Sequence, residues 1–188
     1  MARTPPLGAR LCLREYRPDD VTAVLAYASD PEVTRYLPWG PEGPEEVSAF
    51  LERTAAEARE APRRQWELAA VRRDTQELLG AGRIGIVSFE NRLGDVGYVL
   101  RRDAWGKGLG GEIAELLVRF GFAGLGLHRI EATCDPENQA SRRVLERAGL
   151  RCEGLVREHL LVRGRWRDSL LFGILEQEWR GDRAGAPA

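Results

Sequence analysis

The most informative segment of the chain reads Trp105-Gly106-Lys107-Gly108-Leu109-Gly110-Gly111. It follows an alternating apolar run that predicts a strand, and from Leu109 onward apolar residues recur at helical spacing. Glycines let a backbone approach a ligand closely, and the first N–H groups of a helix are unpaired at the positive end of its dipole. The segment therefore predicts an anion site, most naturally for a phosphate or pyrophosphate group. A tight turn is the alternative, but four glycines in six positions are more than a turn requires.

Two other phosphate motifs match this segment less well. Gly106, Gly108 and Gly111 fit the G-x-G-x-x-G pattern, and Glu131 lies 20 residues beyond Gly111, as in dinucleotide-binding folds. Such a loop opens its fold, however, whereas about 90 residues of mixed elements precede this one and 77 of the 188 residues follow it. A P-loop is excluded because Lys107 is followed by glycine rather than by Ser or Thr. A nucleotide-binding oxidoreductase is therefore the least favoured class.

Hydrophobic periodicity and turn residues divide the rest of the chain into strands and helices. Strands are expected at residues 10–17, 66–72, 79–89, 96–101, 128–134, 150–162 and 166–175. Helices are expected at residues 21–28, 45–59, 109–120 and 137–148, with a loop and one helical turn across 30–44. Turns are expected at 73–74, 91–94 and 163–165. Gly121, Gly124 and Gly126 are expected to end the third helix.

The resulting order of elements is β α α β β β α β α β β. This order predicts an α/β (α+β) fold with a mixed, mostly antiparallel sheet of about seven strands flanked by helices. No linker or repeat interrupts it, so we expect one domain over residues 8–180 and a flexible tail at 181–188, which is rich in Gly and Ala.

Composition excludes several classes of protein. The 28 basic and 29 acidic side chains give a net charge of −1, so no basic field points to nucleic acid or an anionic membrane. The scattered Cys12, Cys134 and Cys152, with two histidines, predict neither a disulfide framework nor a metal site. The first residues lack the apolar stretch of a signal peptide, and no window approaches the roughly 20 apolar residues of a membrane span. We therefore expect a cytoplasmic protein without metal, nucleic-acid or membrane partners.

The glycine segment and the order of elements together resemble the GNAT acetyltransferase superfamily, whose acyl-CoA pyrophosphate loop is [Q/R]-x-x-G-x-[G/A] after the fourth strand. Residues 105–110 fit this pattern except that Trp105 stands in place of Gln or Arg, a departure typical of the RimJ/RimL-like branch. Further matches are GYVL at 97–100, NQAS at 138–141, VLERAGL at 144–150, PEV at 31–33 and LPW at 37–39. The resemblance covers about residues 8–180 and implies the GNAT fold.

The resemblance also implies a site for acetyl-CoA, the acetyl donor. Main-chain groups of Val99 and Leu100 would pair with the pantetheine arm like an added strand. The pyrophosphate would be held by the backbone N–H groups of Trp105, Gly106, Lys107, Gly108, Leu109, Gly110 and Gly111. Asn138 would bond the pantetheine and Ser141 would lie near the sulfur; a helix cap and an exposed first-turn serine are the alternatives. Many members carry a tyrosine at the position of Leu145 as proton donor to the thiolate, so its absence gives that role to Ser141 or to water.

Aminolysis of a thioester needs a neutral amine, a polarised carbonyl and a proton for the departing thiolate. Deprotonating an α-amine of pKa near 7.8 costs about 1 kcal/mol at pH 7, whereas a lysine amine of pKa near 10.4 costs roughly 4.6 kcal/mol. An α-amine therefore needs only a modest base. The resemblance places Asp95 on the strand before the loop as that base, acting through a water, and a turn aspartate is the alternative.

Contacts to the acceptor are expected from three side chains. Tyr36 and Trp39 lie in the segment between the first two helices, where the family builds its acceptor pocket, although either can equally be core. Glu158, beside His159 on the penultimate strand, is a third candidate, with a plain surface position as the alternative. Residues 41–60 are mainly acidic, which suits a cationic acceptor or simply a solvated helix face.

We therefore expect an N-acetyltransferase that moves an acetyl group from acetyl-CoA to a primary amine by direct attack in a ternary complex. The favoured acceptor is a protein N-terminal α-amine of the ribosomal-protein type. A small-molecule amine, such as a polyamine or an aminoglycoside-like compound, is the first alternative. A non-catalytic acyl-CoA-binding module is the second. The resemblance also raises the prospect of a homodimer.

Overall fold

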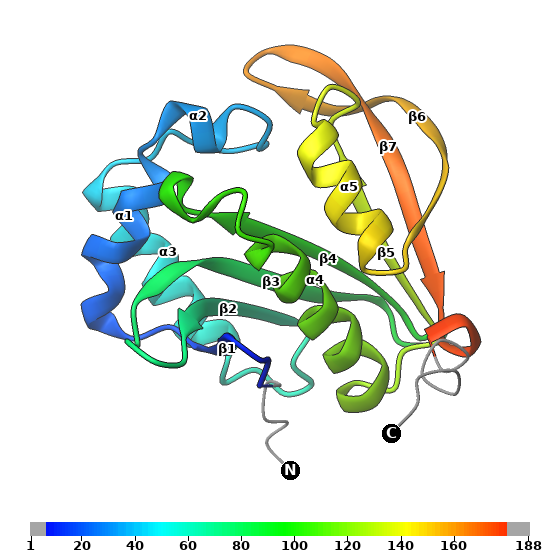
Figure 1. The fold of residues 1–188 in the computed structure, drawn as a ribbon, viewed down its shortest axis with the longest axis horizontal. Helices are drawn as coiled ribbons and strands as arrows, with labels where there is room; N and C mark the ends of the chain where they lie inside the picture. Colours follow the sequence, from blue (N-terminus) through cyan, green and yellow to red (C-terminus); the bar gives the residue numbers. More distant parts are fainter. Residues whose placement is uncertain (1–6, 180–188) are drawn as a thin grey trace.

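The centre of the molecule is a mixed sheet, which in the described residues, 7–179, has seven strands in the order β1-β2-β3-β4-β5-β7-β6 (Figure 1). In this computed structural model the strands are β1 Leu11–Glu15, β2 Gln65–Arg72, β3 Leu78–Ser88, β4 Leu93–Leu100, β5 Arg129–Cys134, β6 Arg151–Val162 and β7 Arg165–Leu175. Neighbouring strands are antiparallel except β4 and β5, which run parallel. The predicted mixed, mostly antiparallel sheet is confirmed.

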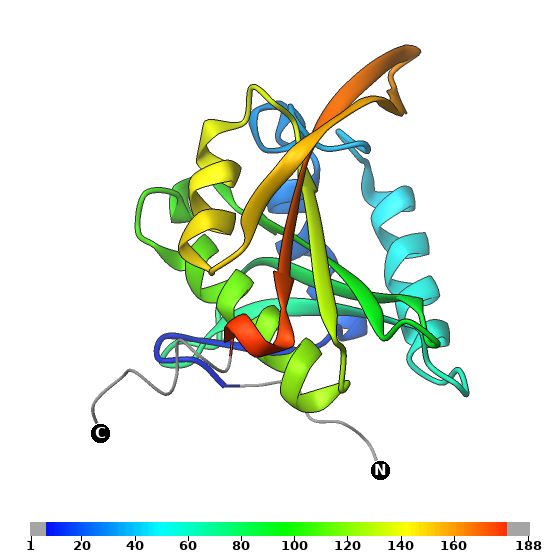
Figure 2. The ribbon, with the colours of Figure 1, turned by 90° about the vertical axis from the view of Figure 1, so that its right-hand side faces the viewer.

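Helices cover both faces of this sheet. They are α1 Val21–Ala28, α2 Pro31–Thr34, α3 Pro44–Glu57, α4 Leu109–Arg119 and α5 Gln139–Arg147, with short 3-10 turns at Pro18–Asp20 and Arg102–Ala104. Figure 2 shows α3 on one side of the sheet and α4 with α5 on the other. The order of elements agrees with the sequence-based prediction, and α2 is the helical turn expected between residues 30 and 44.

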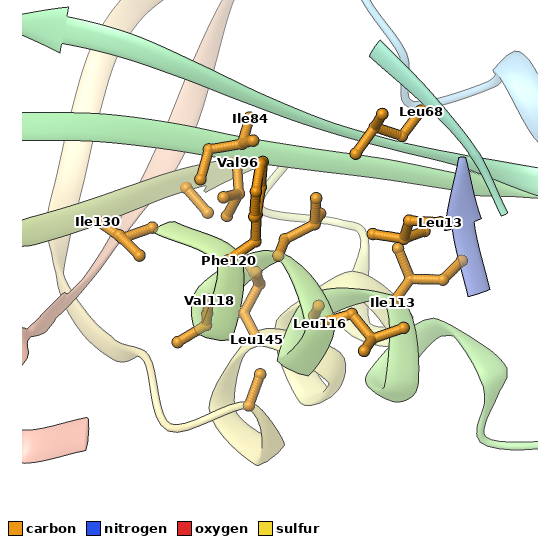
Figure 3. Packing of buried hydrophobic residues seen from close by; sticks show 14 of the residues in the cluster. Leu13, Leu68, Ile84, Val96, Ile113, Leu116, Val118, Phe120, Ile130 and Leu145 are labelled. Atoms are coloured by element: carbon orange, nitrogen blue, oxygen red, sulfur yellow. The ribbon is translucent and has the colours of Figure 1, made fainter. Parts of the chain in front are cut away.

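The larger core lies between the sheet and α4 (Figure 3). Ile113 and Leu117, four residues apart on one face of α4, are fully buried against Leu68 and Ile84 of the strands. Burying one such side chain contributes about 1.5–3 kcal/mol. Leu145 brings α5 into the same cluster, so the two helices on this face are fixed relative to the sheet.

The prediction that Gly121 ends the third helix is wrong. The helix continues as a π-helical segment, Phe120–Gly124, and the left-handed turn comes at Gly126, where φ is +70°. A Cβ atom at Gly121 would lie 2.5 Å from the Ile130 side chain, so this glycine allows close packing of the helix on the sheet. The predicted flexible tail at 181–188 lies outside the described residues.

The predicted turn at 91–94 is also too long. Strand β4 begins at Leu93, so Gly94 and Asp95 belong to the strand, and the alternative of a turn aspartate at Asp95 is wrong. Gly94 signals a close approach instead of a turn, because a Cβ there would lie 2.5 Å from the Leu127 side chain.

Within residues 7–179, no helix has both the length and the apolar character needed to cross a bilayer.

Candidate active site

The sheet divides where its two parallel strands separate. The paired residues of β4 and β5 are Leu93 with Arg129, Gly94 with Ile130 and Asp95 with Glu131. Beyond Asp95 the two strands diverge, while β5 continues along β7 as far as Cys134 (Figure 1). A cavity of about 1220 Å³ opens at this gap and is lined from both faces of the sheet. The gap therefore leaves one edge of β4 open to an extended ligand.

The glycine segment lies at the end of this gap, between β4 and α4. Gly106 and Gly108 have φ of +72° and +73°, a conformation that side chains disfavour, and Gly108 is the residue before α4. A Cβ atom at Gly106 or Gly111 would meet nothing within 4 Å, so open space lies over the loop and the first turn of the helix. The predicted strand, loop and helix are thus confirmed, and the helix N-terminus faces into the cavity with an unobstructed backbone.

Arg10, just before β1, supports the loop from the other side. Its guanidinium Nη1 donates to the Lys107 carbonyl over 2.8 Å, and its Nε donates to the Glu112 carboxylate over 2.9 Å. Burial opposes ionisation of Glu112, but the backbone N–H groups of Arg10 and Leu11 and the guanidinium outweigh it, so the pKa of Glu112 is lowered. Sequence reasoning missed Arg10, because it lies 97 residues from Lys107 and belongs to no motif.

Trp105 uses its indole to close the loop onto the strand. Its Nε1 donates to the Leu100 carbonyl over 2.9 Å, while the side chain stays 45% exposed. One lone pair of the Leu100 carbonyl is therefore already occupied by the indole. Val99 and Leu100 both line the cavity.

Ser141 and Asn138 meet at the start of α5. The Ser141 backbone N–H donates to Asn138 Oδ1 over 3.0 Å, so Asn138 is the N-cap of the helix. This is the helix cap that the sequence analysis gave as the alternative for Asn138. Both residues line the cavity. The Tyr98 hydroxyl reaches Ser141 from β4, with an oxygen–oxygen distance of 2.9 Å to Ser141 Oγ. Sequence reasoning took Tyr98 only as part of the GYVL match and missed this contact.

A row of charged side chains crosses the opposite face of the sheet. Arg83 on β3 donates to the Asp95 carboxylate through Nη1 and Nη2, over 2.5 and 3.2 Å. Its Nε lies 3.5 Å from Glu67 Oε1 on β2, and all three residues line the cavity. Burial raises the pKa of Glu67, and hydrogen bonding from Gln65 and the charge of Arg83 offset this only in part. Asp95 is therefore at the site, paired with a guanidinium.

The loop after α2 lies under the tip of the β6–β7 hairpin. Tyr36 and Trp39 are half-buried and line the cavity, as the prediction of an acceptor pocket requires. Arg167 donates to the Tyr36 carbonyl over 2.8 Å, and Arg163 donates to the Trp39 and Gly40 carbonyls over 3.3 and 2.9 Å. No local sequence signal connects these arginines to a loop more than 120 residues away.

Glu158 is not among the residues that line the cavity. It is exposed at a bulge in β6, with φ of 49°, and its N–H donates to Asp168 over 2.8 Å. The next residue, His159, lines the cavity instead. Among residues 7–179, no group of three or more His, Cys, Asp or Glu side chains is arranged to hold a metal ion.

Comparison with known proteins agrees with this geometry. Residues 10–151 match the family described as acetyltransferase (GNAT) domain. An uncharacterized N-acetyltransferase, p20 of Bacillus licheniformis, is 31% identical over 181 residues, which cover 92% of this chain and 96% of that protein. The ribosomal protein uS5 alanine N-acetyltransferase of Escherichia coli is 31% identical over 106 residues, covering 53% and 55%. Mycobacterium smegmatis RimJ in complex with CoA-disulfide superposes with a TM-score of 0.79 at 28% identity, covering 93% and 89%. The chain is therefore an acetyltransferase that belongs to the GNAT family.

Proposed function

We propose that this chain transfers the acetyl group of acetyl-CoA to a protein N-terminal α-amine, as a member of the RimJ/RimL-like branch. The observation that carries the proposal is the gap between β4 and β5, which ends on the open glycine loop at the start of α4. The residues present fit acetyl-CoA. The backbone over Gly106 and Gly111 is unobstructed, and the exposed Arg143 and Arg147 of α5 line the same cavity and supply positive charge for phosphates.

On the donor side, the chain binds the pantetheine and pyrophosphate of acetyl-CoA and protonates the departing sulfur. The N–H of Leu100 pairs with the pantetheine, and the N–H groups of residues 105–111 hold the pyrophosphate. The main-chain groups of Val99 face β3 instead, because Arg101 N–H donates to the Leu79 carbonyl and alternate residues of a strand point to the same side. Asn138 has its Oδ1 engaged by Ser141, so its amide NH₂ is the group offered to the arm. When the amine nitrogen attacks the carbonyl carbon and the C–S bond breaks, the sulfur receives a proton from Ser141, and Ser141 Oγ regains a proton from water, which balances the amine proton that is released to solvent.

On the acceptor side, Asp95 takes the proton that the amine loses, through a water. A carboxylate is a far weaker base than an amine, and the Asp95 carboxylate is held in place by Arg83. A weak base suffices for an α-amine, which is about 1 kcal/mol from its neutral form at pH 7, but not for a lysine amine at roughly 4.6 kcal/mol. The relative that acts on ribosomal protein uS5 supports the same acceptor class.

A small-molecule polyamine is the second candidate acceptor, and one observation favours it. Glu32, Glu42 and Glu67 all line the cavity in addition to Asp95, and burial raises the pKa of both Glu42 and Glu67. Burial disfavours the negative charge on Glu42 and Glu67, and a second positive charge on the acceptor would stabilise it. Glu158, which lies outside the lining, is proposed to contact only the distal part of a longer acceptor.

Two measurements test the proposal. Thermal denaturation with CoA and with NAD is expected to show a stabilising shift with CoA alone, and a shift with NAD alone would reject the acetyltransferase site. Thiol release from acetyl-CoA is then followed with three acceptors: a peptide with a free α-amine, the same peptide with a blocked N-terminus and an internal lysine, and spermidine. Thiol release with the first peptide supports the α-amine acceptor. Thiol release with spermidine alone would reject the α-amine acceptor in favour of a polyamine. CoA binding without release from any acceptor would favour a non-catalytic module.

A further inference from the structure

Tyr98 and Ser141 meet across the gap at the wall of the cavity. The Tyr98 hydroxyl oxygen lies 2.9 Å from Ser141 Oγ and 3.2 Å from the Ser141 carbonyl oxygen, so its single hydrogen has two neighbouring acceptors. Tyr98 comes from β4 and Ser141 from the first turns of α5, and both line the cavity. Two hydroxyl groups from different elements therefore lie where the CoA sulfur is proposed to bind.

The protonation state of Tyr98 decides whether it has a hydrogen to donate. Burial raises the pKa of Tyr98, and the contact with Ser141 lowers it only in part, so Tyr98 is a neutral phenol at neutral pH. A neutral phenol has one hydrogen to donate, and the acceptors beside it are the two oxygens of Ser141. When Tyr98 donates to Ser141 Oγ, the serine keeps its own hydrogen for a different acceptor.

Cys134 does not compete strongly for that hydrogen. Burial raises the pKa of this thiol to about 11, aided by the charge of Asp135 and opposed by a hydrogen bond with Ser141. A protonated thiol is a weak acceptor and also a weak donor. The Ser141 hydrogen is therefore available to a stronger acceptor in the cavity, such as a thiolate.

The Ser141 backbone is fixed, so the χ1 torsion decides where Oγ lies, and rotation about the Cβ–Oγ bond decides where its hydrogen points. Asn138 Oδ1 accepts the Ser141 N–H over 3.0 Å and sets the start of the helix. A serine within a helix can otherwise turn its hydroxyl back to a carbonyl three or four residues earlier. The contact with Tyr98 opposes that rotation.

We propose that Tyr98 is a positioning residue that directs the Ser141 hydroxyl hydrogen toward the sulfur of CoA. This inference rests on the proposed function of the site. Donation from Tyr98 to Ser141 Oγ also polarises the serine O–H, because hydrogen bonds in a chain strengthen one another. Ser141 touches the sulfur, and Tyr98 acts through Ser141.

The direct test is the acidity of the CoA thiol when it is bound. The thiolate is titrated by its ultraviolet absorbance with CoA bound to the wild type, Tyr98→Phe and Ser141→Ala, after subtracting the titration of the same protein without CoA. A hydrogen bond donated to the thiolate lowers the pKa of the thiol, so both variants are expected to raise it, each weakening the acid dissociation constant about tenfold. Tyr16→Phe is the matched control, because the Tyr16 hydroxyl bonds to Tyr27 at 3.0 Å on the other face of the sheet and is expected to change nothing.

Kinetics supply an independent readout. Tyr98→Phe is expected to lower kcat about tenfold with an unchanged KM for acetyl-CoA, and the double variant Tyr98→Phe, Ser141→Ala is expected to be no slower than Ser141→Ala alone. The inference is wrong if Tyr98→Phe leaves the bound thiol pKa at the wild-type value, or if the two substitutions multiply in kcat. An unchanged thiol pKa in Ser141→Ala also overturns it. Failure of the wild type to bind CoA at all would instead reject the proposed function.

Discussion

The glycines of residues 106–111 differ in what each one does. Gly108 needs its left-handed φ of +73°, and a Cβ at Gly110 would make ordinary contacts of 3.4 Å with Val144 and 3.5 Å with Leu100. At Gly111 the backbone is helical and a Cβ would meet nothing within 4 Å. At Gly111 the absence of a side chain therefore serves a ligand more than the fold.

Substitutions at Gly111 are expected to separate stability from binding. Gly111→Ala removes a helix glycine and is expected to raise the free energy of unfolding by about 0.5–1 kcal/mol. Gly111→Glu puts a negative side chain at the proposed pyrophosphate site and is expected to weaken CoA binding at least tenfold, on the order of 1.4 kcal/mol or more. Urea denaturation and calorimetry with CoA measure the two effects. CoA affinity equal to that of the wild type in Gly111→Glu would contradict the loop assignment.

At the scale of elements, the β6–β7 hairpin determines the shape of the acceptor side. Its tip is a two-residue turn, Arg163-Gly164, in which both residues have positive φ, of 49° and 75°. From this turn the Arg163 guanidinium donates to the carbonyl of Thr34, at the end of α2, and to the Trp39 and Gly40 carbonyls of the loop that follows. The hairpin thus fixes a loop that has little regular structure of its own.

Removing this contact is expected to affect the acceptor and not the donor. Arg163→Ala is expected to raise KM for the amine several-fold with KM for acetyl-CoA unchanged, because a loop freed at two carbonyls, and at the end of α2 before it, must be ordered again on binding. Arg165→Ala, an exposed arginine two residues away, is the matched control. Steady-state kinetics with each substrate varied in turn provide the measurement. Equal changes in both KM values would point to a general loss of structure instead.

Elements were predictable from the sequence where one local pattern determines them. The strand, glycine loop and amphipathic helix around residues 96–120 follow from periodicity and glycine chemistry. The order of elements follows from the same patterns. The contacts that complete the site were not predictable in this way, because they join residues far apart: Tyr98 with Ser141 across 43 positions and Arg10 with Lys107 across 97. Gly94 and Gly121 led to wrong predictions for a related reason. A glycine that allows close packing looks the same in the sequence as a glycine that ends a helix or forms a turn.

At the scale of the whole molecule, Glu112 connects the first strand to the helix that carries the glycine loop. Its carboxylate accepts hydrogen bonds from the backbone N–H groups of Arg10 and Leu11 over 2.7 and 2.9 Å. It also forms an ion pair with the Arg10 guanidinium. The Glu112 side chain is 11% exposed, so these bonds are poorly replaced by water. Arg10 and Leu11, near the beginning of the described chain, and α4, in its middle, are therefore joined through one partly buried charge.

The Glu112 carboxylate makes the free energy of unfolding fall as the pH is lowered. Because the folded pKa of Glu112 is lowered, its contribution is complete above the unfolded pKa near 4.5 and is lost as the pH falls through the folded pKa. Glu112→Gln is expected to lose about 1–3 kcal/mol of unfolding free energy at pH 7, and the difference from wild type is expected to shrink below pH 4.5. Urea denaturation across this pH range measures it. Glu115→Gln, exposed on the same helix, is the control, and a pH-independent deficit in Glu112→Gln would contradict the argument.

The short pairing of β4 with β5 has a mechanical consequence. Three residue pairs join a half-sheet of β1 to β4 to a half-sheet of β5 to β7, and the rest of that seam is a gap. An extended ligand that bonds along β4 fills the seam and adds contacts between the halves. At a concentration 100 times its dissociation constant, a ligand that binds only the folded chain adds about 2.7 kcal/mol to its stability. The supply of acetyl-CoA would then govern both turnover and how firmly the two halves of the sheet stay together.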